Sequence, residues 1–316
     1  MAPSSLGALH RFELERVLSH DTFTQTIALL GSFPAPDPTT ARNAAVVRIE
    51  RAALPLDDAA NIFGTGMADI RLIESNDIYT WLLGWLSPST TRPDVKINII
   101  CPATEVHIRK YSAQKPLLVR ESPELYERIV KPYIDTFPAS RTKWVTDILE
   151  GRSEADKILH RDTHPDYGYV LLPDMKWDLS TLSSLYLVAI ASSPAIRSLR
   201  DLKKAHIPML KSIRREAHRV ATEKWGLGQG TLRLFIHYQP SYYHFHVHIV
   251  NVEYQGLLGM TVGQAHLLDD VVSLLELSPD DGPSILERMT LTYGLGDQHG
   301  LYEAMRAAQA ELDEQA

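Results

Sequence analysis

The sequence predicts an α+β protein of two domains, and three observations support this. The chain has 316 residues, enough for two domains of ordinary size. Segments that alternate apolar and polar residues, as strands do, are mixed with segments that have helical spacing. Asp135–Ser140, rich in turn-forming residues, then predicts a hinge. We expect residues 1–44 (a helix and a flexible loop) and 45–134 to form the N-terminal domain. The hinge would be 135–143 and the C-terminal domain 144–316.

The composition limits the class of protein. Apolar residues make up 44% and charged residues 22%, which is typical of globular proteins. No run of eighteen apolar residues occurs and Met1–Ser5 lacks a basic start with an apolar core, so we expect neither a membrane span nor a secretory signal. Cys101 is the only cysteine, which excludes an intrachain disulfide and a thiolate zinc cluster. A reducing compartment is expected: the cytoplasm, with the nucleus as an open alternative.

The net charge limits the partners. It is −7 at pH 7 with histidines neutral. Long nucleic acid is a polyanion whose non-specific binding needs a basic surface, so this charge argues against such a partner. A small phosphorylated ligand stays compatible, because it needs only a few local Lys and Arg side chains.

The first domain is expected to mix helices and strands. Residues 10–33 are predicted as a polar helix, and the Pro-, Thr- and Ala-rich segment 34–43 as a loop. Further helices are predicted at Asp57–Phe63, Ala103–Ser112 and Glu121–Ile134. Strands are predicted at Ala45–Glu50, Ile70–Ser75 and Val95–Ile100.

The second domain is expected to hold a sheet with helices. A helix begins at Trp144, and strands are predicted at Glu154–Leu159, Tyr167–Pro173 and Leu185–Ala191. The long helix Arg200–Trp225 contains Pro208, which marks either a break or the start of its main body, and Gly226 ends it. An antiparallel hairpin pairs Leu232–Tyr238 with Tyr243–Val250, and mostly helical segments follow at Val262–Leu277 and Gly282–Ala310.

The second strand of that hairpin carries a row of histidines. His244, His246 and His248 alternate with Phe245, Val247 and Ile249. Successive side chains of a strand point to opposite faces, so the three imidazoles are expected on one face and the apolar residues on the other.

Three interpretations of the row stay open from the residues alone. It is a solvated face, a metal site, or a nucleophilic site for chemistry on phosphorus. His246, His248 and Glu253 resemble the cupin metal pattern, but Pro240 stands where that pattern has a glycine. Neutral imidazole is a good nucleophile near pH 7, and flanking imidazoles can donate hydrogen bonds to phosphoryl oxygens.

A resemblance favours phosphorus chemistry. His244–Val250 fits the histidine-triad motif, His-φ-His-φ-His-φ-φ, at every position. That superfamily comprises nucleotide hydrolases and transferases. The motif does not specify the nucleotide.

Longer segments resemble one branch of that superfamily, the scavenger mRNA decapping enzymes. They are Ile236–His244, Gly168–Trp177, Ile196–Leu202, Trp144 with Glu154–Asp156, Ser75–Tyr79 and Pro102–Thr104. The resemblance implies hydrolysis of the m7GpppN cap dinucleotide and short capped oligoribonucleotides to 7-methylguanosine monophosphate and a nucleoside diphosphate, with no metal and no cofactor. It also implies a histidine-triad core in the C-terminal domain and a homodimer with exchanged N-terminal domains. No membrane or long nucleic acid is implied as a partner.

The resemblance assigns roles by position. His246 is the expected nucleophile, His244 and His248 orient it and donate hydrogen bonds, and His237 and Tyr242 touch the phosphates. Trp144 would stack on the cationic purine, and Glu154 would accept its N1–H and amino hydrogens. The further substrate-binding positions are Lys157, Pro173, Asp174, Lys176 and Ser241, with Asn76, Lys110 and Tyr111 in an N-terminal lid.

One position departs from the family pattern. Gln264 precedes Ala265–Leu268, where relatives usually have a basic residue, which puts rate and affinity in doubt. Two alternative functions stay open. The first is another histidine-triad hydrolase, acting on dinucleoside polyphosphates or phosphoramidates. The second is a cap-binding regulator without catalysis.

Overall fold

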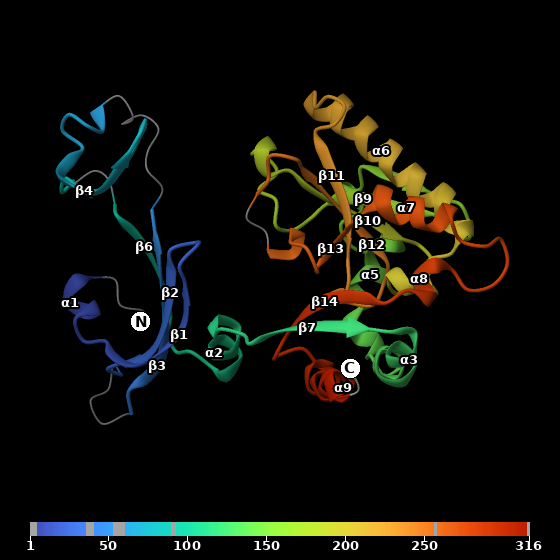
Figure 1. Cartoon of the computed structure of the whole chain (residues 1–316), viewed down its shortest axis with the longest axis horizontal. Coiled ribbons are helices and arrows are strands. Elements are labelled where there is room, and N and C mark those ends of the chain that lie inside the picture. The colour runs from blue at the N-terminus through green and yellow to red at the C-terminus, as the bar shows by residue number, and fades with distance from the viewer. Residues whose placement is uncertain (1–4, 36–40, 53–60, 90–92, 256–257, 315–316) are drawn as a thin grey trace. The chain divides into compact units, whose positions relative to one another are not determined.

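A computed structural model of the chain describes residues 5–35, 41–52, 61–89, 93–255 and 258–314. It divides into two compact units, Met1–Gln114 (unit 1) and Lys115–Ala316 (unit 2) (Figure 1). The division precedes the predicted hinge at 135–143 because the segment in between belongs to unit 2. There β7 (Pro116–Glu121) pairs antiparallel with β14 (Leu291–Gly296). No helix in the described ranges is long and apolar enough to cross a membrane.

Unit 1 is built on a four-stranded antiparallel sheet in the order β1-β2-β3-β6. Its strands are β1 (Glu13–Asp21), β2 (Thr26–Phe33), β3 (Asn43–Arg51) and β6 (Val95–Ile100). One face packs Leu18, Leu30 and Val46 against the helix α2 (Glu105–Tyr111). The other face packs Phe33 and Val47 against Leu9 of the helix α1 (Leu6–Leu9). The strands predicted at 45–50 and 95–100 and the helix predicted at 103–112 are confirmed.

The helix predicted at residues 10–33 is wrong, because this segment forms the hairpin β1–β2. The Asp21 carboxylate accepts the backbone N–H groups of Phe23 and Thr24 at 2.9 and 3.2 Å. Gln25 completes the turn at φ 52°. Burial alternates along the first residues of β2, the period of a strand. In the helix predicted at 57–63, residue 61 is in a 3₁₀ conformation and residues 62 and 63 form a turn, and the rest lies outside the described residues. Residues 36–40 of the predicted loop also lie outside them.

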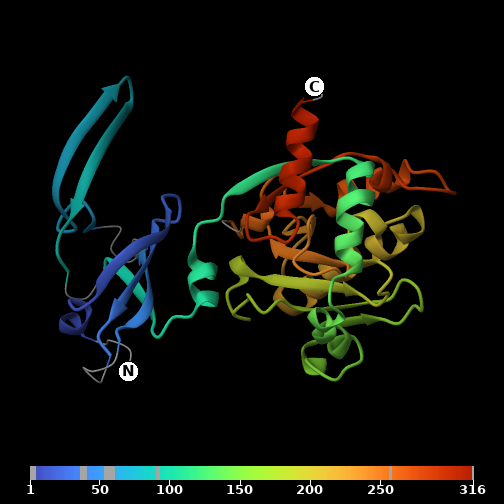
Figure 2. The same cartoon turned by 90° about the horizontal axis from the view of Figure 1, so that it is seen from below.

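A second hairpin projects from the four-stranded sheet of unit 1 (Figure 2). It joins β4 (Met67–Asn76) to β5 (Tyr79–Leu86), with Asp77 in the left-handed region at the turn. The strand predicted at 70–75 is therefore confirmed. Large apolar side chains are exposed along both strands, namely Ile70, Leu72, Ile73, Tyr79, Trp81, Leu82, Leu83 and Trp85.

Unit 2 is built on a six-stranded sheet in the order β13-β11-β12-β10-β9-β8, in which every neighbouring pair is antiparallel. Its strands are β8 (His160–Asp162), β9 (Tyr169–Pro173), β10 (Tyr186–Ala191), β11 (Leu232–His237), β12 (His246–Asn251) and β13 (Ala265–Leu267). Its helices are α3 (Pro123–Leu125), α4 (Lys131–Asp135), α5 (Lys143–Leu149), α6 (Ile207–Trp225), α7 (Leu268–Glu276), α8 (Ile285–Arg288) and α9 (Tyr302–Glu314). A π-helical turn joins α3 to α4.

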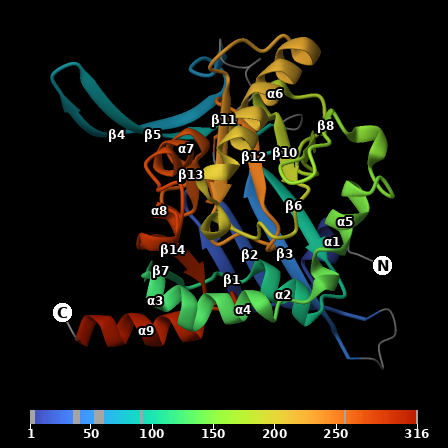
Figure 3. The same ribbon diagram turned by 90° about the vertical axis from the view of Figure 1, so that its right-hand side faces the viewer.

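Helices cover the two faces of this sheet differently. The long helix α6 (Figure 3) buries Leu210, Ile213 and Ala217 in the large core that contains Val247 and Ile249. On the opposite face α5 packs Val145 and Ile148 against residues of β9 and β10. Pro208 lies in the first turn of α6, and Gly226 ends it at φ 68°, so the predicted true start and the predicted end are confirmed.

Two further predictions for unit 2 need correction. Glu154–Leu159 is not a strand. Glu154 is in the left-handed region, Ala155–Lys157 form a 3₁₀ turn, and β8 begins only at His160. The segments predicted as mostly helical also contain the strands β13 and β14. The strand β13 pairs with β11 at the edge of the six-stranded sheet, and β14 pairs with β7.

Candidate active site

The histidine row straddles the start of β12. His246 pairs with Ile190 and His248 with Val188, and paired residues of neighbouring strands lie on one face of the sheet. That face is the one covered by α5. His244 precedes the strand, which was predicted to begin at Tyr243. The hairpin and the shared face of His246 and His248 are therefore confirmed, and the third imidazole leaves the regular alternation.

His246 holds an imidazole with a free nitrogen. Its Nδ1 lies 2.8 Å from the carbonyl oxygen of His244. A carbonyl can only accept, so the ring proton is on Nδ1 and Nε2 keeps its lone pair. The buried Nε2 finds no hydrogen-bond partner among the described residues. Burial lowers the pKa of His246 to about 4, so the ring is neutral at pH 7.

His248 can hold the opposite tautomer. Its Nδ1 lies 2.8 Å from the hydroxyl of Tyr186. When this hydroxyl donates to Nδ1, the ring proton sits on Nε2. This Nε2 also finds no partner in the described ranges. Burial first, and then the neighbouring His246, His237 and Lys176, hold the pKa of His248 well below its usual range.

The two remaining histidines use their Nε2 atoms inside the protein. His244 donates from Nε2 to the carbonyl oxygen of Ala191 at 2.6 Å, and His237 donates to that of Gly259 at 2.8 Å. The His237 ring lies 4.2 Å from the His248 ring, between centroids. His244 therefore serves His246 through its backbone carbonyl, whereas His237 lines the site beside His248.

Two aromatic rings continue the site from His246. Tyr242 stacks on the His246 ring with centroids 4.2 Å apart and an interplanar angle of 11°. Trp144 stands edge-on to Tyr242 at 5.0 Å and is 44% exposed. Trp144 reaches this place because the next residue, Val145, is buried against the sheet in the cluster that Tyr242 joins. Tyr242 thus connects an accessible indole to the imidazole that has a free nitrogen.

The remaining predicted polar residues of unit 2 form local contacts. Lys176 Nζ lies 5.2 Å from the centroid of the Tyr186 ring, and its charge contributes to the lowered pKa values of His246 and His248. Asp174 was predicted to share an extended face with Lys176. Instead its carboxylate accepts the Lys176 backbone N–H at 2.9 Å in a turn that follows Pro173 at the end of β9. Glu154 and Lys157 pair at 3.1 Å.

The chain is similar to known proteins over nearly its whole length. Residues 7–114 match the family described as "Scavenger mRNA decapping enzyme (DcpS) N-terminal", and residues 143–262 match "Scavenger mRNA decapping enzyme C-term binding". The chain belongs to the scavenger mRNA decapping enzyme family. It is 38% identical over 305 residues to the m7GpppX diphosphatase of Schizosaccharomyces pombe, covering 96% of both chains. It is 34% identical over 298 residues to that of Homo sapiens, covering 94% of this chain and 86% of the relative.

The residues predicted to form an N-terminal lid lie in unit 1. Asn76 ends β4 at the hairpin turn and pairs with Tyr79. Lys110 and Tyr111 are in the last turn of α2, where Lys110 Nζ lies 5.6 Å from the Tyr111 ring centroid. The histidines belong to unit 2. A contact of these lid residues with the cap therefore stays a prediction.

Gln264 has a defined place in this scavenger decapping enzyme. Its side-chain amide donates to the Gly294 carbonyl oxygen of β14 at 2.8 Å, and its backbone carbonyl oxygen accepts the Tyr238 N–H at 3.1 Å. A Cβ on Gly294 would lie 2.6 Å from the Gln264 amide nitrogen, so this approach needs a glycine. Gln264 thus donates its side-chain amide to the backbone of β14. The predicted site residue Ser241 is exposed on the loop after β11.

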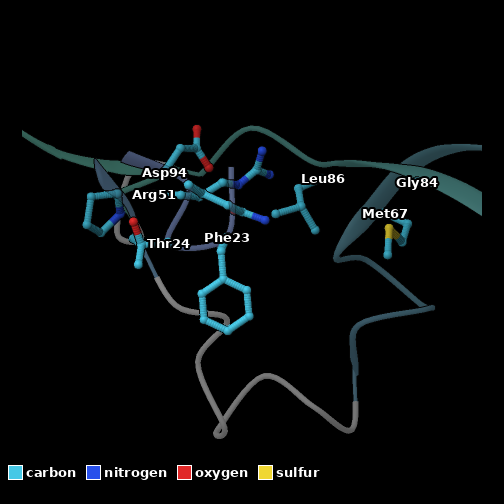
Figure 4. A pocket seen from close by; sticks show the side chains of 10 residues that line it. Phe23, Thr24, Arg51, Met67, Gly84, Leu86 and Asp94 are labelled. Carbon is cyan, nitrogen blue, oxygen red and sulfur yellow. The ribbon is translucent and has the colours of Figure 1, made fainter. Parts of the chain in front are cut away.

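Sequence reasoning missed Tyr186, the partner of His248. A signal was available, because Tyr186, Val188 and Ile190 share one face of β10 and Tyr186 alone has a polar tip. The metal interpretation finds no support, since the described ranges contain no group of three His, Cys, Asp or Glu that could hold an ion. A cavity of about 610 Å³ in unit 1 lies among Phe23, Arg51 and Asp94 (Figure 4), and its lining contains none of the predicted site residues.

Proposed function

We propose that this chain hydrolyses m7GpppX and short capped RNA fragments to 7-methylguanosine monophosphate and a nucleoside diphosphate. The observation that carries the proposal is the unpartnered Nε2 of His246, a neutral nucleophile whose ring is linked through Tyr242 to the accessible ring of Trp144. The curated relatives named m7GpppX diphosphatase cover nearly the whole chain, which supports the same substrate here. In this account the C-terminal part is a histidine-triad core.

The proposed reaction has two displacements. His246 Nε2 attacks the phosphorus next to 7-methylguanosine, a phosphorus–nitrogen bond forms, and the nucleoside diphosphate leaves with the electrons of the broken phosphorus–oxygen bond. Water then attacks the same phosphorus and gives up a proton to the solvent, and the phosphorus–nitrogen bond breaks with its electron pair returning to Nε2. His248 donates from Nε2–H to a phosphate oxygen where charge develops, and Lys176 adds positive charge near it. No step needs a metal.

Cap recognition follows from the residues around Trp144. A methylated, cationic purine stacks well on an indole, and Trp144 has an exposed ring for it. Glu154 accepts the hydrogens of the purine edge, and Lys157, its ion-pair partner at 3.1 Å, is then close to the phosphates. Asp174 and Lys176 take the ribose and the phosphates.

We extend the proposal to a homodimer with exchanged N-terminal domains. An isolated two-stranded hairpin is marginally stable in water, and large exposed apolar patches mark interaction sites. The β4–β5 hairpin exposes eight large apolar side chains, which supports burial against another surface. Asn76, at its tip, would then close over short substrates together with Lys110 and Tyr111. Analytical ultracentrifugation tests this: a mass near that of a 35.5 kDa monomer would contradict it.

Product analysis tests the activity. Methylated cap dinucleotide is incubated with wild type, His246→Asn and His266→Asn, with chelator present throughout. His266 is the matched control, because its Nε2 is also buried without a partner in the described chain yet lies on β13. We expect release of 7-methylguanosine monophosphate by wild type and His266→Asn only. Binding of the dinucleotide by wild type without cleavage would indicate a cap-binding regulator. If wild type neither binds nor cleaves the dinucleotide, the proposal is refuted.

A further inference from the structure

A buried carboxylate is hydrogen-bonded to Tyr238 and Gln239, which begin the loop between β11 and β12. Glu121, the last residue of β7, is 0% exposed. Arg200, 1% exposed, donates to Glu121 Oε1 from Nε at 3.0 Å and from Nη2 at 2.8 Å. Arg200 also donates from Nη1 to the carbonyl oxygens of Leu286 and Met289, each at 2.7 Å. The pair is therefore fixed to the segments around α8 and β14, independently of the histidines.

Three neutral side chains complete the shell of Glu121. Tyr238 donates its hydroxyl to Oε1 at 2.7 Å. Tyr293, on β14, donates its hydroxyl to Oε2 at 2.6 Å, and Gln239 donates its amide to Oε2 at 3.1 Å. A carboxylate offers about four lone-pair sites, so the donors saturate it. Such a buried carboxylate holds its donors firmly, because the loss of any donor leaves part of the buried negative charge uncompensated.

Gln239 connects this carboxylate to the loop that carries Tyr242. Its amide nitrogen donates to Glu121, and its amide oxygen accepts the hydroxyl of Tyr243 at 3.1 Å. Gln239 precedes Tyr242 in the chain and Tyr243 follows it, so the loop is held on both sides of Tyr242. Tyr242 is the residue whose ring stacks on His246 and meets Trp144 edge-on.

We propose that Glu121, acting through Gln239, is a positioning residue that holds Tyr242 against the ring of His246. Neither residue touches the reacting atoms. Stacking on one side and the hydrogen bond from Nδ1 to His244 together fix the plane of the His246 ring, and hence the direction of its Nε2 lone pair. A small rotation of this ring misaligns the attack on phosphorus, which lowers the rate. The inference rests on the proposed hydrolase activity.

A matched pair of variants separates positioning from simple stabilisation. Gln239→Met and Tyr293→Phe each remove one neutral donor to the same Glu121 oxygen. Only Gln239→Met removes the side chain that accepts the Tyr243 hydroxyl, whereas Tyr293→Phe leaves that hydrogen bond in place. We expect similar losses of thermal midpoint in both. We also expect kcat on cap dinucleotide to fall about tenfold in Gln239→Met and to stay near wild type in Tyr293→Phe. Equal kcat values in the two variants would overturn the inference.

A second readout works without turnover. The stacked Tyr242 ring shifts the His246 ring-proton resonances upfield, and these are observable in protein with labelled histidine. Gln239→Met, and Tyr243→Phe as the milder variant should Gln239→Met fail to fold, are expected to lose this shift, while Tyr293→Phe keeps it. An unchanged shift in the loop variants refutes the inference. Wild type that keeps the shift but does not cleave the cap dinucleotide refutes only the proposed function.

Discussion

The neutral state of His246 predicts a specific loss of stability in acid. The perturbation is a change from pH 7, above the ordinary histidine pKa of 6.5, to pH 5, which lies between that value and the folded pKa of about 4. In this interval the unfolded chain binds a proton that the folded chain does not. Stability therefore rises with pH there and is lost as the pH falls from about 6.5 to about 4.

The magnitude follows from the same two pKa values. At pH 5 most unfolded imidazole is protonated and little of the folded one is, so His246 alone costs about 2 kcal/mol relative to pH 7. His248, whose pKa is also held low by burial, adds to the loss. The His246→Asn variant has no such group, so its stability should fall about 2 kcal/mol less than that of wild type over the same interval.

Urea unfolding at both pH values measures the difference. The fluorescence of Trp144, Trp177 and Trp225 follows unit 2. His10→Asn, at an exposed position of unit 1, controls for the removal of any histidine. We expect wild type and His10→Asn to lose stability alike, and His246→Asn to lose less. Equal losses in all three proteins would refute a buried neutral His246.

Three further predictions concern activity on cap dinucleotide. Tyr186→Phe should lower kcat about tenfold, because the His248 proton is no longer held on Nε2; an unchanged kcat in steady-state assays would reject this tautomer. Trp144→Ala should abolish the preference for 7-methylguanosine monophosphate over guanosine monophosphate in binding titrations, a loss of about 1–2 kcal/mol. Trp144→Phe should have an intermediate preference. A preference retained in Trp144→Ala would mean that the cap does not stack on Trp144. Dialysis against chelator should leave kcat unchanged, and activity restored only by added metal would disprove the metal-free mechanism.

The sequence predicted those parts of the fold that local patterns determine. The period-two alternation around His246 gave the antiparallel hairpin, and Pro208 and Gly226 gave the ends of α6. The helix predicted at residues 10–33 is wrong because a few apolar positions there have helical spacing by chance. The β-branched residues and the turn at Asp21 favour the hairpin that forms. The strand predicted at Glu154–Leu159 is wrong because Glu154 adopts a left-handed backbone conformation. This conformation depends on the surrounding structure, and the alternation of apolar and polar residues does not predict it.

The candidate site could be predicted only as residue types in a row. The motif named His244, His246 and His248 together, but their different roles come from partners far along the chain. Tyr186 and the Ala191 carbonyl oxygen, both on β10, determine which nitrogen of His248 and of His244 is used. The Glu121 carboxylate contacts residues more than a hundred positions away, and strand pairing of β7 with β14 brings some of them together. Such contacts leave no periodic signal.

The stereochemical course at phosphorus tests the central claim, attack by His246 Nε2, most directly. Cap dinucleotide with a chiral phosphorothioate next to 7-methylguanosine is hydrolysed in ¹⁸O-labelled water, and the configuration of the labelled thiomonophosphate is determined. Two displacements, first by His246 and then by water, predict overall retention of configuration. Inversion would mean that water attacks directly, and would contradict a nucleophilic role for His246.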